Sequence, residues 1–425
     1  MLDIRYIRNN EDKVRWACEV KGINIDIAEL LRLDSELLSS KQEVEQLQQQ
    51  RNQLAKNFPK SGTPQEKQAH AAKGREIGDK IKSLEEGSAE ADARYRELML
   101  QMPNVPYDAA PIGPDDTGNV VIEQVGSVPK FDFEVRDHVE LLELNDWADF
   151  PRAAKVSGSR SYLLKNDLAV LEQSLLLLAT KRLSAQGFTP VNVPALVNEA
   201  ALVGTGHFPG SREDIYHLTL DDMFLSGTAE VVINSLHAGE LMKEEELPLL
   251  YVGFSPCFRR EAGSAGKDVR GLLRVHQFNK IEQFVICKND PEESWSWHDK
   301  LLAHARALVE DLELPYQVIE VCTGDMGAGK VRMHDIETWL PSQEKYRETH
   351  SCSSLHEWQS RRSNVRYKGA DGKNLHVHTL NNTLVATPRI IAPLLECHQQ
   401  ADGSVRLPRI LQPYFDGRTQ IGGAG

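Results

Sequence analysis

Residues 251–286 read YVGFSPCFRREAGSAGKDVRGLLRVHQFNKIEQFVI. Apolar, β-prone residues at both ends favour two antiparallel strands, with Val252 and Phe254 in the first and Phe284 in the second. The loop between the strands is rich in glycine and in basic residues: Arg259, Arg260, Gly263, Gly266, Lys267, Arg270, Gly271 and Arg274. Glycine allows close approach of the backbone to a ligand, and guanidinium groups bind phosphate oxygens through paired hydrogen bonds. The stretch therefore predicts a β-hairpin that binds phosphate groups.

The totals narrow the class of protein. A chain of 425 residues is long enough for two or three domains with a large core. The formal charge of −13 argues against nucleic-acid binding through basic residues spread over the whole surface, although it leaves room for a local basic surface. The six cysteines are widely spread without a C-x-x-C pair, which predicts reduced thiols and neither a disulfide framework nor a zinc site.

The sequence also predicts where the protein works. The amino-terminal residues MLDIRYIRNN are charged and lack the apolar segment of a signal peptide. The longest apolar run, near Leu175 to Ala179, is too short to cross a bilayer. We therefore expect a soluble, cytoplasmic protein without a membrane partner.

A second pattern fills residues 27–99, which are rich in Gln, Glu, Lys and Leu and almost free of aromatic side chains. Seam positions recur there at intervals of three and four on both sides of a Pro/Gly break at residues 59–64, with Ser40, Arg51 and Ser88 as polar interruptions. The other seam residues are Leu30, Leu33, Leu37, Val44, Leu47 and Leu54 before the break, and Ile77, Ile81, Leu84, Ala91, Tyr95 and Leu98 after it. Two such seams predict an antiparallel helical hairpin, with helices of roughly 28 to 35 residues that are about 40–50 Å long.

Two functions remain open for this hairpin. The pattern alone favours a dimerising or merely solvated coiled coil. The alternative is a rigid arm that reaches along an extended partner, because basic residues gather in its outer half, where phosphate contacts would be useful. These residues are Lys56, Lys60, Lys67, Lys73, Arg75, Lys80 and Lys82. Acidic residues are interleaved with them, so charge does not decide between the two.

Several further motifs carry polar groups at the ends of predicted elements. The stretch FLSGTAE (224–230) predicts a strand that turns into a helix, with Thr228 as its cap and Glu230 in its first turn. The alternative is that this hydroxyl and this carboxylate face a bound ammonium or hydroxyl group. Gly329-Lys330 is followed by Val331, which excludes the G-x-x-x-x-G-K-[ST] phosphate loop.

The carboxy-terminal part adds a carboxylate and an arginine. Residues 335–341 predict a strand, and Glu348 follows among hydroxyl residues that suit Mg²⁺, although solvated loop polarity explains them equally well. Residues 375–380 predict another strand, followed by Asn381-Asn382-Thr383. Arg389 then opens an apolar helix, where the helix dipole favours acids, so a bound phosphate is one explanation for it.

Together these motifs resemble those of bacterial-type seryl-tRNA synthetases, which are class II aminoacyl-tRNA synthetases. GFTPVNVPAL is similar to the family's motif 1, residues 258–282 to motif 2 and NNTLVATPR to motif 3; the helical hairpin, TAE and QADGSVRLPRILQPY also match. The resemblance covers essentially the whole chain. It implies an α+β fold, in which helices flank an antiparallel β-sheet core and an antiparallel coiled-coil arm precedes it. The implied domains are a tRNA-binding domain at 1–105, a linker at 106–130 and a catalytic domain at 131–425.

The resemblance implies an ATP-dependent ligase with two steps, in which serine is activated to seryl-adenylate and then passed to the 3′ end of tRNA(Ser), and also of tRNA(Sec). It implies Mg²⁺ with the ATP, no zinc, and a homodimer. Arg259, Glu282 and Arg389 are the implied catalytic residues. The residues implied for ATP are Arg259, Arg260, Glu261, Val275, Phe278, Glu348, Thr349, His350, Ser351 and Arg389. Those implied for serine are Thr228, Ala229, Glu230, Arg259, Glu282 and Thr383. Glu348 and Ser351 are the implied Mg²⁺ ligands.

The chain departs from the family's pattern in three places. The usual E-I-S-S is here Glu348-Thr349-His350-Ser351, the usual N-G-S of motif 3 is 381–383 Asn-Asn-Thr, and Arg260 replaces a serine. Two other functions are weighed against the ligase. A synthetase-like paralogue that loads a carrier protein lacks the arm that this chain has. A catalytically silent coiled-coil scaffold has no need of the retained arginines and carboxylates.

Overall fold

The computed structural model describes residues 1–59, 61–262 and 270–423. The chain divides into two compact units. One unit holds residues 3–18 and 23–102, and the other holds residues 1–2, 19–22 and 103–425.

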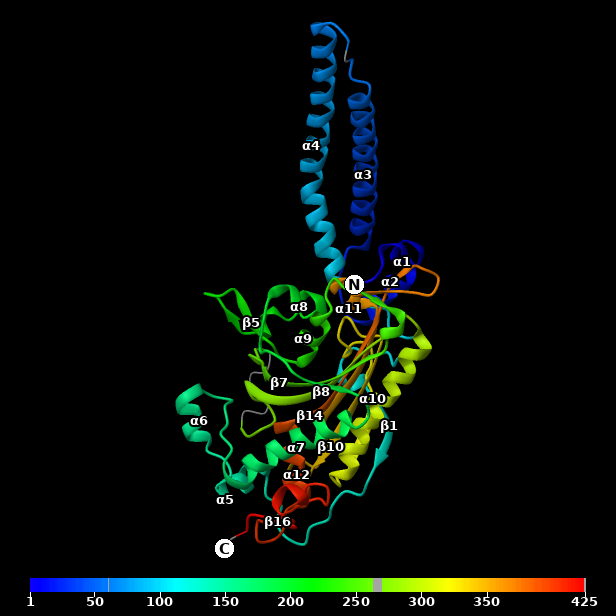
Figure 1. The fold of residues 1–425 in the computed structure, drawn as a ribbon. Helices are drawn as coiled ribbons and strands as arrows, with labels where there is room; N and C mark the ends of the chain where they lie inside the picture. Colours follow the sequence, from blue (N-terminus) through cyan, green and yellow to red (C-terminus); the bar gives the residue numbers. More distant parts are fainter. Residues whose placement is uncertain (60, 263–269, 424–425) are drawn as a thin grey trace. The chain divides into compact units, whose positions relative to one another are not determined.

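The smaller unit is built around a helical hairpin of α3 (Ile27–Lys56) and α4 (Pro64–Gln101), preceded by α1 (Ile4–Asn9) and α2 (Glu11–Val20). Figure 1 shows α3 and α4 side by side. The predicted seam is confirmed in the middle of the hairpin, where apolar side chains of both helices pack together: Val44, Leu47, Leu54, Ile77, Ile81 and Leu84. The Thr63 side chain caps α4 in a reciprocal pair with Glu66, and Pro64 takes the first helical position, which explains the sharp start.

The larger unit contains an eight-stranded sheet in which every neighbouring pair is antiparallel except β7 with β2. From edge to edge its strands are β1 (Val120–Val125), β9 (Tyr316–Glu320), β10 (Arg332–Leu340), β11 (Lys345–His356), β14 (His378–Ala386), β8 (Gln277–Cys287), β7 (Leu249–Phe258) and β2 (Thr189–Asn192). The predicted α+β fold class and the predicted hairpin of β7 and β8 are confirmed. Their register runs from Leu249 opposite Ile286 to Phe258 opposite Gln277.

Helices cover both faces of this sheet. Successive side chains of β8 point to opposite sides and therefore pack against different helices. Val285 packs with the helices α7 (Asn166–Ser184), α10 (Pro291–Asp311) and α12 (Thr387–His398) in the main core. Phe284 packs on the other face with Ala229 and Ile233 of α9 (Ala229–Leu236). Figure 1 shows α9 on one side of β7 and β8 and α7 with α12 on the other.

The remaining elements are short. The helices are α5 (His138–Leu144), α6 (Phe150–Ser157), α8 (Glu199–Thr205) and α11 (Trp358–Ser363). Three small sheets contain β13 (Asn374–His376), β12 (Arg366–Lys368) and β6 (Leu241–Lys243); β3 (Leu196–Val197), β5 (Met223–Leu225) and β4 (His217–Leu218); and β15 (Val405–Arg406) with β16 (Gln420–Ile421).

The structure differs from the sequence prediction in one segment. The single strand predicted at residues 375–380 is wrong: β13 ends at His376, and β14 begins at His378 and continues through Asn381–Thr383 to Ala386. The reason is that β13 pairs with β12 in a different sheet, so the chain changes sheets at the buried Val377. The segment 106–130 contains β1, which pairs with β9 at the edge of the main sheet.

One further expectation agrees with the structure. β2 with its Pro190 lies at the sheet edge, where a proline without an N–H is tolerated. None of the six cysteines, all of which are among the described residues, forms a disulfide, and all are buried. Within the described parts of the chain, no helix is long and apolar enough to cross a membrane. The loop residues Gly263, Gly266 and Lys267 lie outside the described residues.

Candidate active site

The strongest candidate site is a cavity of about 280 Å³ on the α9 face of the sheet, next to the β7–β8 hairpin. Strands β8, β11 and β14 and the first turns of α9 and α12 all contribute to its wall. Its polar and charged lining residues are His207, Thr228, Glu230, Arg259, Glu261, Arg274, Lys280, Glu282, Lys330, Glu348, Thr349, Ser351, Asn381, Thr383 and Arg389. Charges of both signs therefore meet in one cavity.

Strand β8 contributes three side chains at even spacing. Phe278, Lys280 and Glu282 all line the cavity, because residues two apart in a strand point to the same face. Lys280 and Glu282 are only 4% and 3% exposed, so their charges must be compensated locally.

A buried cluster of Thr228, Lys280 and Glu282 provides that compensation. The Lys280 ammonium donates to Glu282 Oε1 at 2.9 Å and to Thr228 Oγ1 at 2.7 Å. Glu282 Oε2 accepts from the Thr228 hydroxyl and, at 3.0 Å, from the Glu230 backbone N–H. Burial pushes the pKa of Glu282 up, but Lys280 and the Thr228 hydroxyl outweigh burial and bring this pKa below its ordinary value. Glu282 is therefore a carboxylate at neutral pH.

The spacing between α9 and the sheet is set at Gly253, which lies opposite Glu282 in the register of β7 and β8. A Cβ atom at this glycine would lie 2.7 Å from Ile233 Cδ1 and 2.9 Å from Ala229 Cβ, both on α9. The helix therefore packs directly against the strand backbone. This contact places Thr228 and Glu230, at the start of α9, next to Glu282.

Glu230 is the second carboxylate of this end of the cavity. Its Oε1 accepts from Gln359 Nε2 at 2.5 Å, and the Gln359 carbonyl accepts from the Thr379 hydroxyl at 2.7 Å, which fixes the orientation of the amide. Burial and the neighbouring Glu282 raise the pKa of Glu230. The two carboxylates therefore form a negative end of the cavity that suits a small ammonium group.

Two β-bulges shape the opposite wall. In β11, Ile336 pairs with His350 and the next residue, Glu337, pairs with Glu348, so Thr349 is an extra residue. A bulge reverses which face later side chains take. Glu348 and Ser351 consequently both line the cavity although they are three residues apart. In β14, Leu384 is the extra residue, because Thr383 pairs with Glu282 and Val385 with Ile281.

His350 connects the two bulges from behind the cavity wall. Its Nε2 lies 3.1 Å from the Leu384 carbonyl, to which it must donate, so Nδ1 accepts from the Thr349 hydroxyl at 2.8 Å. Burial lowers the pKa of His350 to about 4, which keeps this neutral form. The side chain of His350 is buried and does not line the cavity.

Arginines line the other end. Arg389, in the first turn of α12, lies 3.0 Å from Glu348 Oε1. The Arg259 guanidinium lies over the Phe278 ring, 5.3 Å from its centroid. Arg274 pairs with Glu261 at 2.7 Å. Guanidinium groups next to an aromatic ring suit a ligand that carries both phosphates and a flat base.

Comparisons with known proteins give the family. A family model described as the seryl-tRNA synthetase N-terminal domain matches residues 1–106, and one described as the tRNA synthetase class II core domain (G, H, P, S and T) matches residues 217–398. The chain is 52% identical to a serine–tRNA ligase of Deinococcus radiodurans over 99% of both chains. The chain belongs to the seryl-tRNA synthetase family. A serine–tRNA ligase of Symbiobacterium thermophilum is 42% identical over 97% of this chain and 98% of that protein.

Solved structures of seryl-tRNA synthetases agree with this assignment. The enzyme of Pyrococcus horikoshii, complexed with ATP, superposes with a TM-score of 0.91 at 39% identity and full coverage of both chains. The cytoplasmic enzyme of Naegleria fowleri, in complex with AMP, reaches 0.87 at 27% identity over 100% of this chain and 99% of that one. As a member of this family, the protein is an ATP-dependent serine–tRNA ligase.

Most of the site residues expected for a seryl-tRNA synthetase meet in the one cavity. Those that line it are Thr228, Glu230, Arg259, Glu261, Val275, Phe278, Glu282, Glu348, Thr349, Ser351, Thr383 and Arg389. Three do not. Arg260 is exposed and donates its backbone N–H to the Asp214 carbonyl. Ala229 packs in the core of α9, and His350 lies behind the wall.

The sequence analysis missed several lining residues, among them Lys280, Lys330 and His207. The sequence does indicate Lys280 as a lining residue, because it lies at even spacing between Phe278 and Glu282. Lys330 was considered only as part of a phosphate loop. His207 had none, because it enters from the loop after α8, which belongs to none of the three motifs.

His207 presents an acceptor nitrogen. The Thr205 hydroxyl donates to the Ala201 carbonyl at 3.1 Å, so it accepts from His207 Nδ1–H at 3.0 Å and leaves Nε2 unprotonated. Burial and the nearby Arg259 lower the pKa of His207 to about 4. His207 also lines a second cavity of about 440 Å³ that shares Arg259 and Arg389 with the first.

Proposed function

We propose that this ligase works in two steps in the cavity described above. The serine carboxylate attacks the α-phosphate of ATP and releases pyrophosphate, and a ribose hydroxyl at the 3′ end of tRNA then attacks the seryl carbonyl and releases AMP. The observation that carries this proposal is the meeting of an ammonium-binding end and a phosphate-binding end in one cavity. Chemistry of this kind needs positioning and charge compensation more than a covalent nucleophile.

The serine end is formed by Thr228, Glu230, Glu282 and Thr383. Glu282 already accepts three hydrogen bonds, from Lys280, Thr228 and the Glu230 backbone. A carboxylate has about four acceptor positions, so one remains for a serine donor. Thr383 lies opposite Glu282 in the strand register and adds a hydroxyl. A site that binds the substrate hydroxyl rejects alanine, because a buried acceptor would be left without its partner.

The ATP end uses Arg259, Arg389, Phe278 and the backbone of Val275. Arg259 neutralises charge that develops on the α-phosphate, and Arg389 binds the far phosphates. The Phe278 ring stacks on adenine, and this proposal is supported by the Arg259 guanidinium, which lies over the same ring at 5.3 Å from its centroid. Glu261 orients Arg274 through their ion pair.

Glu348 and Ser351 are the proposed ligands of Mg²⁺. The bulge at Thr349 brings this carboxylate and this hydroxyl to the cavity side of β11, so the donor set fits a hard cation. Within the described residues no group of three or more His, Cys, Asp or Glu side chains forms a metal cage. Such a sparse set suits Mg²⁺, which takes most of its ligands from phosphates and water and supplies charge neutralisation there.

The partners follow from the family. We assign tRNA binding to residues 1–105 with the arm of α3 and α4, catalysis to residues 131–425, and the connection to residues 106–130. We expect tRNA(Ser) and tRNA(Sec) as the RNA substrates, a homodimer as the assembly and the cytoplasm as the location. The exposed lysines of the outer arm suit phosphate contacts, which position an RNA without reading its sequence.

Serine-dependent exchange of pyrophosphate into ATP tests the first step. We expect exchange with serine and at least about 100-fold less with alanine, because of the hydroxyl acceptors described above. Replacing Arg259 by alanine is expected to lower the exchange rate by more than about tenfold, as one lost charge contact does. No exchange with pure protein, or a normal rate in the Arg259→Ala variant, would contradict the proposal.

Removal of the arm tests the division of labour. Deleting residues 35–98 is expected to abolish serylation of tRNA while pyrophosphate exchange persists, because the cavity lies wholly in the larger unit. Equal loss of both reactions would show that the arm is needed for the fold of the catalytic unit.

A further inference from the structure

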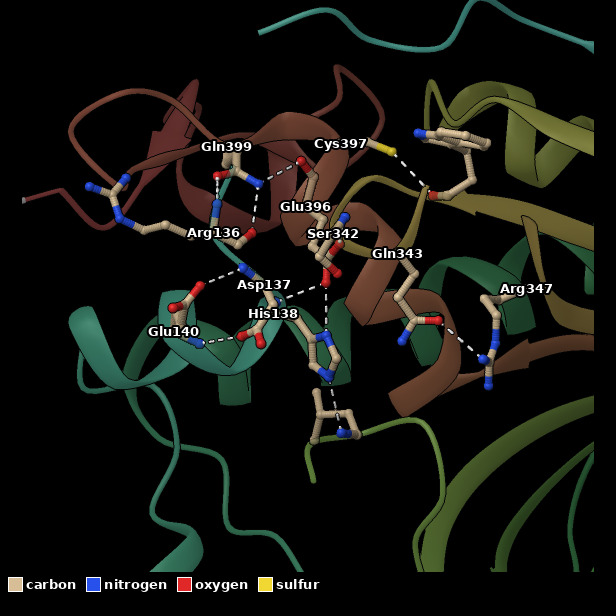
Figure 2. A network of polar contacts seen from close by, with 12 residues as sticks. Arg136, Asp137, His138, Glu140, Ser342, Gln343, Arg347, Glu396, Cys397 and Gln399 are labelled. Carbon is tan, nitrogen blue, oxygen red and sulfur yellow. Dashed lines mark hydrogen bonds and ion pairs between the residues drawn. The ribbon is translucent and has the colours of Figure 1, made fainter. Parts of the chain in front are cut away.

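A buried polar cluster outside the cavity joins three parts of the larger unit. His138, at the start of α5, donates its backbone N–H to Glu396 Oε1 at 2.9 Å, and its Nδ1 lies 2.8 Å from the same oxygen. Glu396 Oε2 accepts from the Ser342 backbone N–H at 2.9 Å. Figure 2 shows the Glu396 carboxylate between the His138 ring and Ser342. His138 is 5% exposed and Glu396 is fully buried, so water does not compete for these bonds.

The other ring nitrogen of His138 holds the backbone of the motif 2 loop. The Leu272 N–H donates to His138 Nε2 at 3.3 Å. Nε2 must therefore be an acceptor, so the ring proton is on Nδ1, which donates its hydrogen bond to Glu396. The carboxylate thus selects the tautomer that can accept from Leu272.

The loop depends on this acceptor because residues 270–275 form no strand or helix. Where such a segment is buried, its N–H groups need partners that no sheet provides. Arg160 holds the far end of the segment: its Nη1 donates to the Arg274 carbonyl at 3.4 Å, and its own carbonyl accepts from the His276 N–H at 3.0 Å. The segment from Leu272 to Val275 lines the cavity at the proposed ATP end.

Gly271 shows how closely the imidazole fits against the loop. This glycine has φ +88°, and a Cβ atom built on it would lie 2.3 Å from His138 Nε2. The ring therefore lies directly against the backbone of the loop. The Leu272 side chain is fully buried in the main core, which fixes the segment from its other side.

Glu396 carries the connection to the phosphate end. It lies in α12, two helical turns after Arg389 of the same helix. The cluster therefore connects the backbone beside the proposed adenine position to the helix that carries the proposed phosphate arginine.

We propose that His138 is a positioning residue for ATP: held by Glu396, it fixes Leu272 and thereby the loop segment up to Val275 in the conformation that binds the nucleotide. The proposal rests on the placement of ATP under Proposed function. A merely structural histidine would contribute to stability and affect both substrates alike.

Two substitutions separate the contacts of the ring. Asparagine places its amide near the position of Nδ1, so His138→Asn keeps a donor to Glu396 but loses the acceptor for Leu272. Glutamine reaches the position of Nε2, so His138→Gln keeps that acceptor. We expect His138→Asn to raise the KM for ATP about tenfold, the equivalent of one lost hydrogen bond, with the KM for serine and kcat within about twofold of wild type. His138→Gln should recover most of the ATP affinity.

The matched control is His398→Asn. His398 is also buried and lies in the last turn of α12, but its ring contacts the Leu312 carbonyl and Arg406, away from the cavity. It should lower the melting temperature and leave both KM values unchanged. An unchanged KM for ATP in His138→Asn, or a parallel rise for ATP and serine in both His138 variants, would overturn the inference. Failure of the proposed ATP site itself would show differently, as a normal exchange rate in Arg259→Ala.

Discussion

Lys280→Met removes the only cation that contacts Glu282 within the described residues, because the other hydrogen-bond donors to Glu282 are the Thr228 hydroxyl and the Glu230 backbone N–H, which are neutral. The substitution keeps the length and apolar body of the side chain, so it tests the charge rather than the packing. It leaves the buried Glu282 without the cation that contacts it, next to the second carboxyl group of Glu230.

The size of the effect follows from burial. Removing one partner of a buried ion pair costs about 3 kcal/mol or more, because the remaining charge has lost both water and its partner. In the wild type the pKa of Glu282 is below its ordinary value. The stability that the ionised Glu282 contributes to the fold is therefore present above pH 4.5 and is lost only as the pH falls through the lowered pKa. In the variant, burial and Glu230 raise this pKa instead. The destabilisation should therefore be about 3 kcal/mol at pH 7.5 and shrink towards pH 5, as the carboxyl takes up a proton.

Urea unfolding at pH 7.5 and pH 5.0, followed by circular dichroism, measures both quantities. Lys288→Met is the matched control, because Lys288 directly follows β8 and pairs with Glu244 at 3.0 Å on the surface. This control should remain close to wild type at both pH values. A loss below about 1 kcal/mol in Lys280→Met, or an equal loss at both pH values, would refute the reasoning. The KM for serine of Lys280→Met should also rise, since Lys280 orients the Glu282 acceptor.

Three further outcomes follow from the structure. Arg389→Ala should lower pyrophosphate exchange more than about tenfold and Arg389→Lys less, because lysine keeps the charge and loses the paired hydrogen bonds; steady-state kinetics measure both. When the pH falls from 7.5 to 5.5, the wild type should lose about 1 kcal/mol more stability than His207→Gln. The reason is that the unfolded histidine binds a proton near pH 6.5 and the folded one only near pH 4; urea unfolding at both pH values measures this difference. Gly206→Ala should cost at least about 2 kcal/mol in thermal unfolding, because its φ is +84° and the new methyl would lie 2.2 Å from the Trp358 ring.

Sequence periodicity was sufficient to predict the two largest features. The heptad spacing around the break at 59–64 predicts the helical hairpin, because a seam must face its partner helix to be buried. The apolar, β-prone residues at both ends of 251–286 predict two antiparallel strands, and the structure shows β7 paired with β8 from Leu249 to Phe258. Both predictions depend only on local geometry that repeats along the chain.

The bulges could not be predicted from the sequence. In a regular strand Glu348 and Ser351 would face opposite sides, so their spacing argued against a common site. The extra residue at Thr349 reverses this, and its position depends on pairing with β10 and on the His350 contact to Leu384. The role of His207 in the cavity could not be predicted for a related reason, since its position results from tertiary packing and not from a pattern in the sequence.

The contact at Gly253 means that the width of the proposed serine pocket is a helix-to-strand packing distance. One wall of the proposed pocket is the start of α9 and the other is β8, and the distance between them is set where α9 packs on the bare backbone of Gly253 in β7, beside β8. A single methyl group at position 253 would push α9 outward together with Thr228 and Glu230. In the proposed serine pocket, selection among amino acids of different size would therefore depend on a residue without a side chain, which has no need to touch the substrate.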